Sequence, residues 1–185
     1  MKKLLLFLSA FVPLYFLVTI KIIIDLINQN LHFNFLNTIS LVFFIVLISV
    51  GLYGAKIAIA HQKTKPTKIK ILNYTSITEQ YFLGYFSLFV LFALSFELEK
   101  VSMFIVFMII IVLIGLVYIR NDLFYINPLL NILGYNFYTV SYINFENQEK
   151  QQSGIFIFYG KLDISNPYFI AKLSHENFSL LEPQI

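Results

Sequence analysis

A short lysine-rich segment, Lys56–Lys70, separates two apolar runs of a length suited to crossing a bilayer. SLVFFIVLISVGLYGA precedes it, and YFLGYFSLFVLFALSF follows it. The segment contains five of the 13 basic residues of the chain. Short loops rich in lysine and arginine resist translocation, so we expect this loop on the cytoplasmic side of a membrane. Its position therefore determines the predicted orientation of every other segment.

The composition indicates an integral membrane protein. Of the 185 residues, 58% are hydrophobic and only 12% are charged, whereas soluble domains average about 25% charged residues. The chain contains no cysteine. Disulfides, thiolate chemistry, cysteine-based zinc sites and a lipoprotein anchor are thereby excluded.

Hydropathy predicts a helical membrane protein with four transmembrane helices, at about residues 4–24, 36–60, 80–96 and 101–119. The first apolar run is longer than the core of a signal peptide, about 7–15 residues, so we expect it to remain as a span. Pro13 lies in the middle of this run. Because proline clashes with the carbonyl four residues before it, we expect a kink there.

The distribution of basic residues predicts the orientation. Lys2, Lys3 and Arg120 join the lysine-rich segment on one side, and only Lys21 and Lys100 fall on the other. An excess of positive charge marks the cytoplasmic side. We therefore predict a multi-pass membrane protein with both termini in the cytoplasm.

Two pairs of small residues in the second predicted span indicate a packing face. Gly51 and Ala55 form one pair, and Gly54 and Ala58 form the other, each with four-residue spacing. Small residues at this spacing let two helix backbones approach closely. The sequence leaves open whether the second helix belongs to the same protomer or to another.

Outside the spans, the pattern predicts a small cytoplasmic α+β cap, made of residues 121–185 together with the 61–79 loop, beside a membrane domain of residues 1–120. Alternating or β-branched runs predict four short strands: Lys68–Ser76, Tyr138–Phe145, Gly154–Leu162 and Tyr168–Leu173. We expect Asn177–Leu181 to add a helical turn. Asn127 as N-cap, Pro128 at the first position and Gly134 at the end predict a short interfacial helix.

No catalytic, cofactor-binding or metal site is expected, and we do not expect an enzyme. The three histidines are scattered, and the motifs of nucleotide-binding loops, serine hydrolases and zinc proteases are absent. The interiors of the predicted spans lack the ionisable residues that pumps and ion-coupled transporters place there. Serine and threonine hydroxyls in the spans suit contacts between helices, although an oligomeric pore would show the same pattern.

The lysines of the loop are the candidate contact residues for anionic lipid or for a partner protein: Lys63, Lys65, Lys68 and Lys70. A lysine near an anionic membrane surface contributes about 1 kcal/mol of attraction. Direct binding of nucleic acid is not expected, because the acidic residues of the C-terminal tail outnumber its lysines.

Three segments resemble the membrane subunit of the Kiwa anti-phage defence system: MKKLLLFLSAFVPLYFLVTIKIIIDLINQN, KIKILNYTSITEQYFLGYFSLFV and FYINPLLNILGYNFYTVSYIN. The most distinctive part is Asn127-Pro128, followed by Gly134-Tyr135 and Tyr138. The resemblance implies a bacterial inner-membrane protein with four spans that forms a homo-oligomer, with a tetramer suspected. It also implies that the protein senses envelope perturbation at infection, and that it anchors or activates a cytoplasmic DNA-binding partner protein. No catalytic residue carries over.

Two other classes fit the same residues. One is a bacteriocin-immunity or superinfection-exclusion membrane protein that acts alone. The other is an oligomeric channel or a holin-like effector. Dependence on a neighbouring partner gene separates the first class from the sensor, and conductance in planar bilayers identifies the second.

Overall fold

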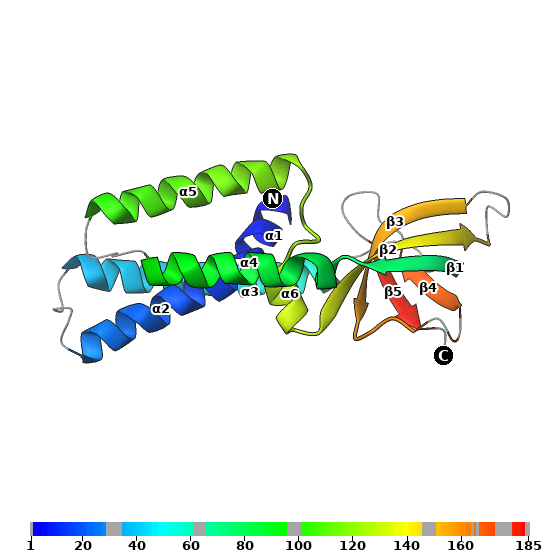
Figure 1. Cartoon of the computed structure of the whole chain (residues 1–185), viewed down its shortest axis with the longest axis horizontal. Helices are drawn as coiled ribbons and strands as arrows, with labels where there is room; N and C mark the ends of the chain where they lie inside the picture. The colour runs from blue at the N-terminus through cyan, green and yellow to red at the C-terminus, as the bar shows by residue number, and fades with distance from the viewer. Residues whose placement is uncertain are drawn as a thin grey trace.

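A bundle of helices and a β-barrel form the two ends of an elongated molecule (Figure 1). The computed structural model describes residues 2–28, 35–60, 66–95, 101–145, 151–163, 165, 167–172 and 179–183. The helices of the bundle are α1 (Lys2–Ala10), α2 (Val12–Ile27), α3 (Phe35–Ala60), α4 (Thr78–Ser95) and α5 (Val101–Arg120). The four apolar runs were therefore correctly predicted to be helical.

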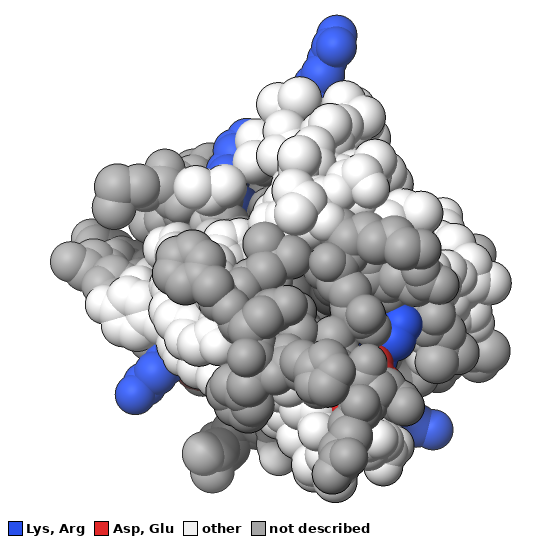
Figure 2. Space-filling model, turned by 90° about the vertical axis from the view of Figure 1, so that its left-hand side faces the viewer, with Lys and Arg blue, Asp and Glu red and all other residues white. Residues whose placement is uncertain are grey.

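By length and composition, two of the described helices can cross a membrane: α3, over Thr38–Ile57, and α5. The bent pair of α1 and α2 makes a third if it forms one span. The first turn of α4 is polar, with the sequence TEQ. Viewed from the end away from the barrel, the described surface carries few charges, and most of the visible basic side chains stand at its edge (Figure 2). Four membrane crossings remain a prediction.

The first predicted span is broken where the kink was expected. Helix α1 ends at Ala10, α2 begins at Val12, and the two axes differ by 45°. Pro13 occupies the first turn of α2, where its missing N–H costs no helical hydrogen bond. Helix α1 consequently leaves the direction of α2 and turns towards the barrel end of the bundle (Figure 1).

The small residues of α3 form a packing face within a single chain. A Cβ atom on Gly51 would lie 2.3 Å from Val12 Cγ2, and one on Gly54 would lie 2.6 Å from the Leu5 carbonyl oxygen. Ala55 is also buried. The partner helices are thus α1 and α2 of the same protomer, while the side chain of Ala58 lies outside the described part of the chain.

The barrel strands are β1 (Pro66–Ser76), β2 (Tyr135–Asn144), β3 (Gln151–Tyr159), β4 (Tyr168–Lys172) and β5 (Ser179–Pro183). They close in the order β1-β2-β3-β5-β4. The β3–β5 pair is parallel, and the other pairs are antiparallel. A five-stranded Greek-key barrel with this connectivity has the topology of the OB-fold. Strand β1 pairs with β4 through its first half, Pro66–Lys70. It pairs with β2 over Ile69–Ser76, with a register shift between Ile71 and Asn73.

The barrel interior is a small apolar core of its own. Ile69 and Ile71 point into it, while Lys68 is exposed and Lys70 is half-buried, as the alternation in the sequence predicts. Burial raises the pKa of the Tyr142 phenol above its ordinary value.

The helical turn expected at Asn177–Leu181 is wrong over the residues that the structure describes. Ser179–Pro183 forms strand β5 instead. Leu181 belongs to the barrel core, and β5 pairs with both β3 and β4. Without β5, the facing edges of β3 and β4 would leave backbone groups unpaired, so closure of the barrel favours a strand over a helical turn.

Alanine at Gly51 and at Gly84 should have opposite effects. Gly51→Ala should lower the free energy of unfolding by about 1–3 kcal/mol, because the new methyl group collides with α2. Gly84→Ala should raise it by about 1 kcal/mol, because nothing lies within 4 Å and alanine favours the helix. Thermal unfolding of the purified protein in detergent measures both. Equal shifts would show that α3 does not pack closely against α2 at this point.

Candidate functional site

A short helix, α6 (Pro128–Ile132), lies where the helix bundle meets the barrel (Figure 1). Asn127 caps it, since its Oδ1 accepts a hydrogen bond from the Leu130 backbone N–H at 3.2 Å. Pro128 occupies the first helical turn, and Gly134 adopts a left-handed φ of 88° beyond its end. The predicted N-cap, first position and terminating glycine are confirmed.

Asn127 also links α6 to the first helix of the chain. The side chain is fully buried, and its Nδ2 donates to Ser9 Oγ on α1 at 2.7 Å. The Ser9 hydroxyl in turn donates to the Leu6 carbonyl at 2.7 Å. Both sides of a buried amide therefore have partners, which makes the contact specific as well as stabilising.

A second polar link joins the first residue of α4 to β2 and α6. Thr78 Oγ1 accepts from the Phe137 N–H on β2 at 2.9 Å and donates to Asn131 Oδ1 at 3.4 Å. The neighbouring Ile77 N–H donates to the Phe137 carbonyl at 2.9 Å. The start of α4, the end of α6 and the start of β2 are therefore held together.

Apolar packing surrounds these links. Ile77, Phe137 and Ile157 belong to the same buried cluster as the helix residues Leu129 and Leu130. The interior of the barrel forms a separate cluster. The core of the bundle thus continues onto the outer face of β2 and β3. We call this region the joint, and it consists of Ser9, Ile77, Thr78, Asn127, Leu130, Asn131 and Phe137.

The N-terminus lies at the same end of the bundle as the joint. Lys3 Nζ is 2.6 Å from Asp122 Oδ1 and 5.6 Å from the centre of the Phe124 ring. Both charged side chains are about half exposed, so this ion pair contributes at most about 1 kcal/mol. Its structural consequence matters more, because the start of α1 and the segment after α5 are placed side by side.

The joint occupies part of the surface that OB-folds use for ligands. In that fold, the strand 2–3 face and the connection between strands 1 and 2 bind oligonucleotides or sugars. Here the connection between β1 and β2 contains α4, α5 and α6. Phe137 and Ile157 on the strand face are fully buried. The chain thus covers part of this face with its own helices.

The predicted contact lysines do not belong to the joint. Lys68 and Lys70 lie on β1, opposite Ile170 and Tyr168 of β4, and Lys63 and Lys65 fall outside the described residues. Within the described ranges, no group of three or more His, Asp and Glu side chains could hold a metal ion. The polar groups of the joint are hydroxyls and amides. Such groups hold the neighbouring helices and strand in a fixed relative position.

Asn127→Ala should reduce the free energy of unfolding by about 2–3 kcal/mol, because it removes a helix cap and leaves buried polar atoms without a partner. Asn127→Ser should be milder, since serine can still cap α6 but is too short to reach Ser9. The control is Asn121→Ala, at an exposed position just after α5. Thermal unfolding in detergent ranks the three variants. A loss for Asn121→Ala as large as that for Asn127→Ala would contradict the role of the joint.

Comparison with known proteins gives one match. No curated protein and no solved structure matches the chain. The family model described as anti-phage protein KwaA matches residues 2–178, which include the helices, the joint and most of the barrel. The resemblance noted in the sequence is confirmed by this match. The chain therefore belongs to the KwaA family of anti-phage proteins.

Proposed function

We propose that this anti-phage protein is a membrane-embedded sensor. Envelope perturbation at infection displaces the helices, the joint passes the displacement to the barrel, and the barrel anchors or activates a cytoplasmic DNA-binding partner. The observation that carries the proposal is the joint itself, in which Asn127 and Thr78 tie α1, α4, α6 and β2 together. No catalytic step is required of this chain.

The fold supports transmission by displacement. Packed interiors repack between discrete arrangements and deform little, so a shift of a helix at the joint is carried to its neighbours. Because the Phe137 N–H and carbonyl are both bonded to the Ile77–Thr78 segment, movement of α4 acts directly on β2. The buried cluster that includes Leu130 and Phe137 adds an apolar contact to the same path.

The proposed topology places four spans in the bacterial inner membrane, with the N-terminus, the C-terminus and the barrel in the cytoplasm. Helices α3 and α5 are long and apolar enough to span. The contact between Lys3 and Asp122 puts the N-terminus on the barrel side of the bundle, and α4 leaves from the barrel while α5 returns towards it (Figure 1). An even number of crossings satisfies both facts.

We assign partner docking to the barrel face formed by β1 and β4. Lys68 is exposed there and Lys70 is half-buried. At the end of this face, the rings of Phe145 and Tyr168 lie 6.0 Å apart, and both side chains are more than 40% exposed. Exposed aromatic side chains are typical of the centre of a protein interface, and charged side chains such as lysine suit its polar rim. We also propose that the chain associates into a homo-oligomer, a tetramer, which would present several such faces.

Thr78→Val should weaken protection while preserving the fold. Valine has the shape of threonine but cannot accept from the Phe137 N–H, which costs about 1–2 kcal/mol. A change of this size in a two-state element shifts its populations about tenfold. We expect phage plating efficiency to rise about tenfold or more, at an unchanged amount of protein in the membrane. The matched control is Thr75→Val, at an exposed position on β1, which should protect normally.

Two results would contradict this proposal. Normal protection by Thr78→Val would show that the joint does not transmit the signal. Full protection by this chain after deletion of the partner gene would show that it acts alone, as an immunity or exclusion protein does.

A fluorescent protein fused after the last barrel strand should fluoresce, because we expect that position to be cytoplasmic. Alkaline phosphatase fused at the same position should be inactive, because that enzyme is active only in the periplasm. The expectation follows from the basic residues near the barrel end of the bundle, which include Arg120 at the end of α5. Phosphatase activity at this position would overturn the topology.

A further inference from the structure

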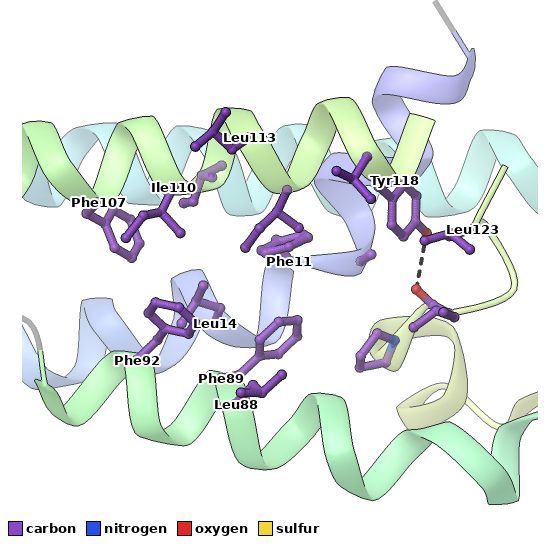
Figure 3. Close-up of a pocket in the computed structure, with 16 residues that line it drawn as sticks. Phe11, Leu14, Leu88, Phe89, Phe92, Phe107, Ile110, Leu113, Tyr118 and Leu123 are labelled. Carbon is purple, nitrogen blue, oxygen red and sulfur yellow. Dashed lines mark hydrogen bonds between the residues drawn. The ribbon is translucent and has the colours of Figure 1, made fainter. Parts of the chain in front are cut away.

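An apolar groove of about 400 Å³ opens between α4 and α5 (Figure 3). Its floor is the bend between α1 and α2. Side chains from three parts of the chain line it, among them Phe11, Leu14, Leu88, Phe92, Ile110 and Leu113. Neither the barrel nor the joint fills this space.

The chemistry of the lining is almost entirely hydrocarbon. Among the described lining residues, only Tyr118 carries a polar side-chain atom. Its hydroxyl donates to the Ile126 carbonyl at 3.1 Å, the bond dashed in Figure 3. An ordered water needs two or more polar partners, whereas apolar cavities of this kind take apolar ligands. The groove is therefore suited to a hydrocarbon ligand.

The surroundings of the groove identify the source of that hydrocarbon. Helix α5 is apolar along its length, and only 17% of its apolar 18-residue window is buried inside the chain. On its outer face, Val112 and Leu116 are about 60% exposed. In a bilayer, such a face is covered by acyl chains. The groove beside it opens onto the same hydrocarbon.

The groove has room for a slender ligand. Its volume of about 400 Å³ accommodates a single extended hydrocarbon chain.

The charge at one end of the groove agrees with a phospholipid. The lining extends along α5 to Val117 and Tyr118 and continues to Leu123. Arg120, which ends α5, is exposed within this stretch. Cations at this level of a membrane attract anionic headgroups.

We propose that the groove holds one acyl chain of an anionic phospholipid, with the headgroup near Arg120. The barrel end of the groove is lined by Ile126 and Pro128, and Pro128 is the first residue of α6. The bound chain therefore touches the segment that carries the joint, so its entry or loss changes the support of α6. This link between lipid and joint rests on the proposed sensor function, whereas the binding of the chain does not.

Native mass spectrometry tests the binding. The full-length protein is purified in mild detergent, stripped of lipid and titrated with phosphatidylglycerol. We expect one tightly held lipid per chain, and about tenfold lower occupancy in Ile110→Trp, because the indole fills the groove. The matched control is Leu116→Trp on the outer face of the same helix, which should bind as the unmodified protein does. Leu88→Trp fills the groove from α4 and serves if Ile110→Trp fails to fold.

Equal occupancy in folded Leu88→Trp and in Leu116→Trp would overturn the site. The site would also be overturned if the unmodified protein formed a dimer without lipid and Leu88→Trp dissociated that dimer. A second copy of the chain would then be what fills the groove. Phage plating with the same variants tests the link. Loss of lipid should change protection, and lipid loss with unchanged protection would overturn the link while the site stands. Loss of protection in Thr78→Val with lipid retained would support the sensor function independently of the groove.

Discussion

The antiparallel pairing of β1 with β2 is the constraint on which the rest of the structure depends. Ser76 is paired with Tyr138, and α4 begins at Thr78, two residues after that pair. Everything between the two strands, namely α4, α5 and α6, must therefore leave from the barrel and return to it. The hairpin of α4 and α5 is clamped at its base by a backbone ladder, and this makes the joint possible.

The joint contains polar groups, whereas a purely apolar contact would have allowed several relative orientations of the barrel and the bundle. Hydrocarbon packing stabilises many relative orientations of a barrel and a bundle, but a buried amide or hydroxyl stabilises only those in which its partners are in reach. Asn127 and Thr78 thereby select one orientation from the set that Ile77, Leu130 and Phe137 would allow. The proposed sensor function requires a second orientation in which these hydrogen bonds are exchanged.

Local patterns in the sequence were sufficient for local features. The apolar runs predicted the helices, Pro13 predicted the bend, and the alternation around Ile69 predicted β1. The cap at Asn127 was predictable as well, because all its signals lie within eight residues. The four crossings and the division into a membrane domain and a cap remain predictions.

Long-range features were not predictable in this way. The bond from Asn127 to Ser9 joins residues 118 positions apart, and nothing local to either residue indicates the other. Strand β5 was taken for a helical turn because its five residues are too few to show an alternation. Its pairing partners, β3 and β4, become evident only when the barrel is closed. The groove also depends on the separation of α4 and α5, which no local pattern in the sequence indicates.

The position of β1 in the chain has a consequence for biogenesis. Strand β1 emerges from the ribosome before α4 and α5, yet its ladder partner β2 is made only after them. The barrel consequently stays open during the synthesis of the hairpin and closes only once both hairpin ends are on the same side. A chain in which the two ends of the hairpin lay apart would leave Ser76 and Tyr138 unpaired and expose the edges of both strands. Closure of the barrel thus depends on both ends of the α4–α5 hairpin lying together.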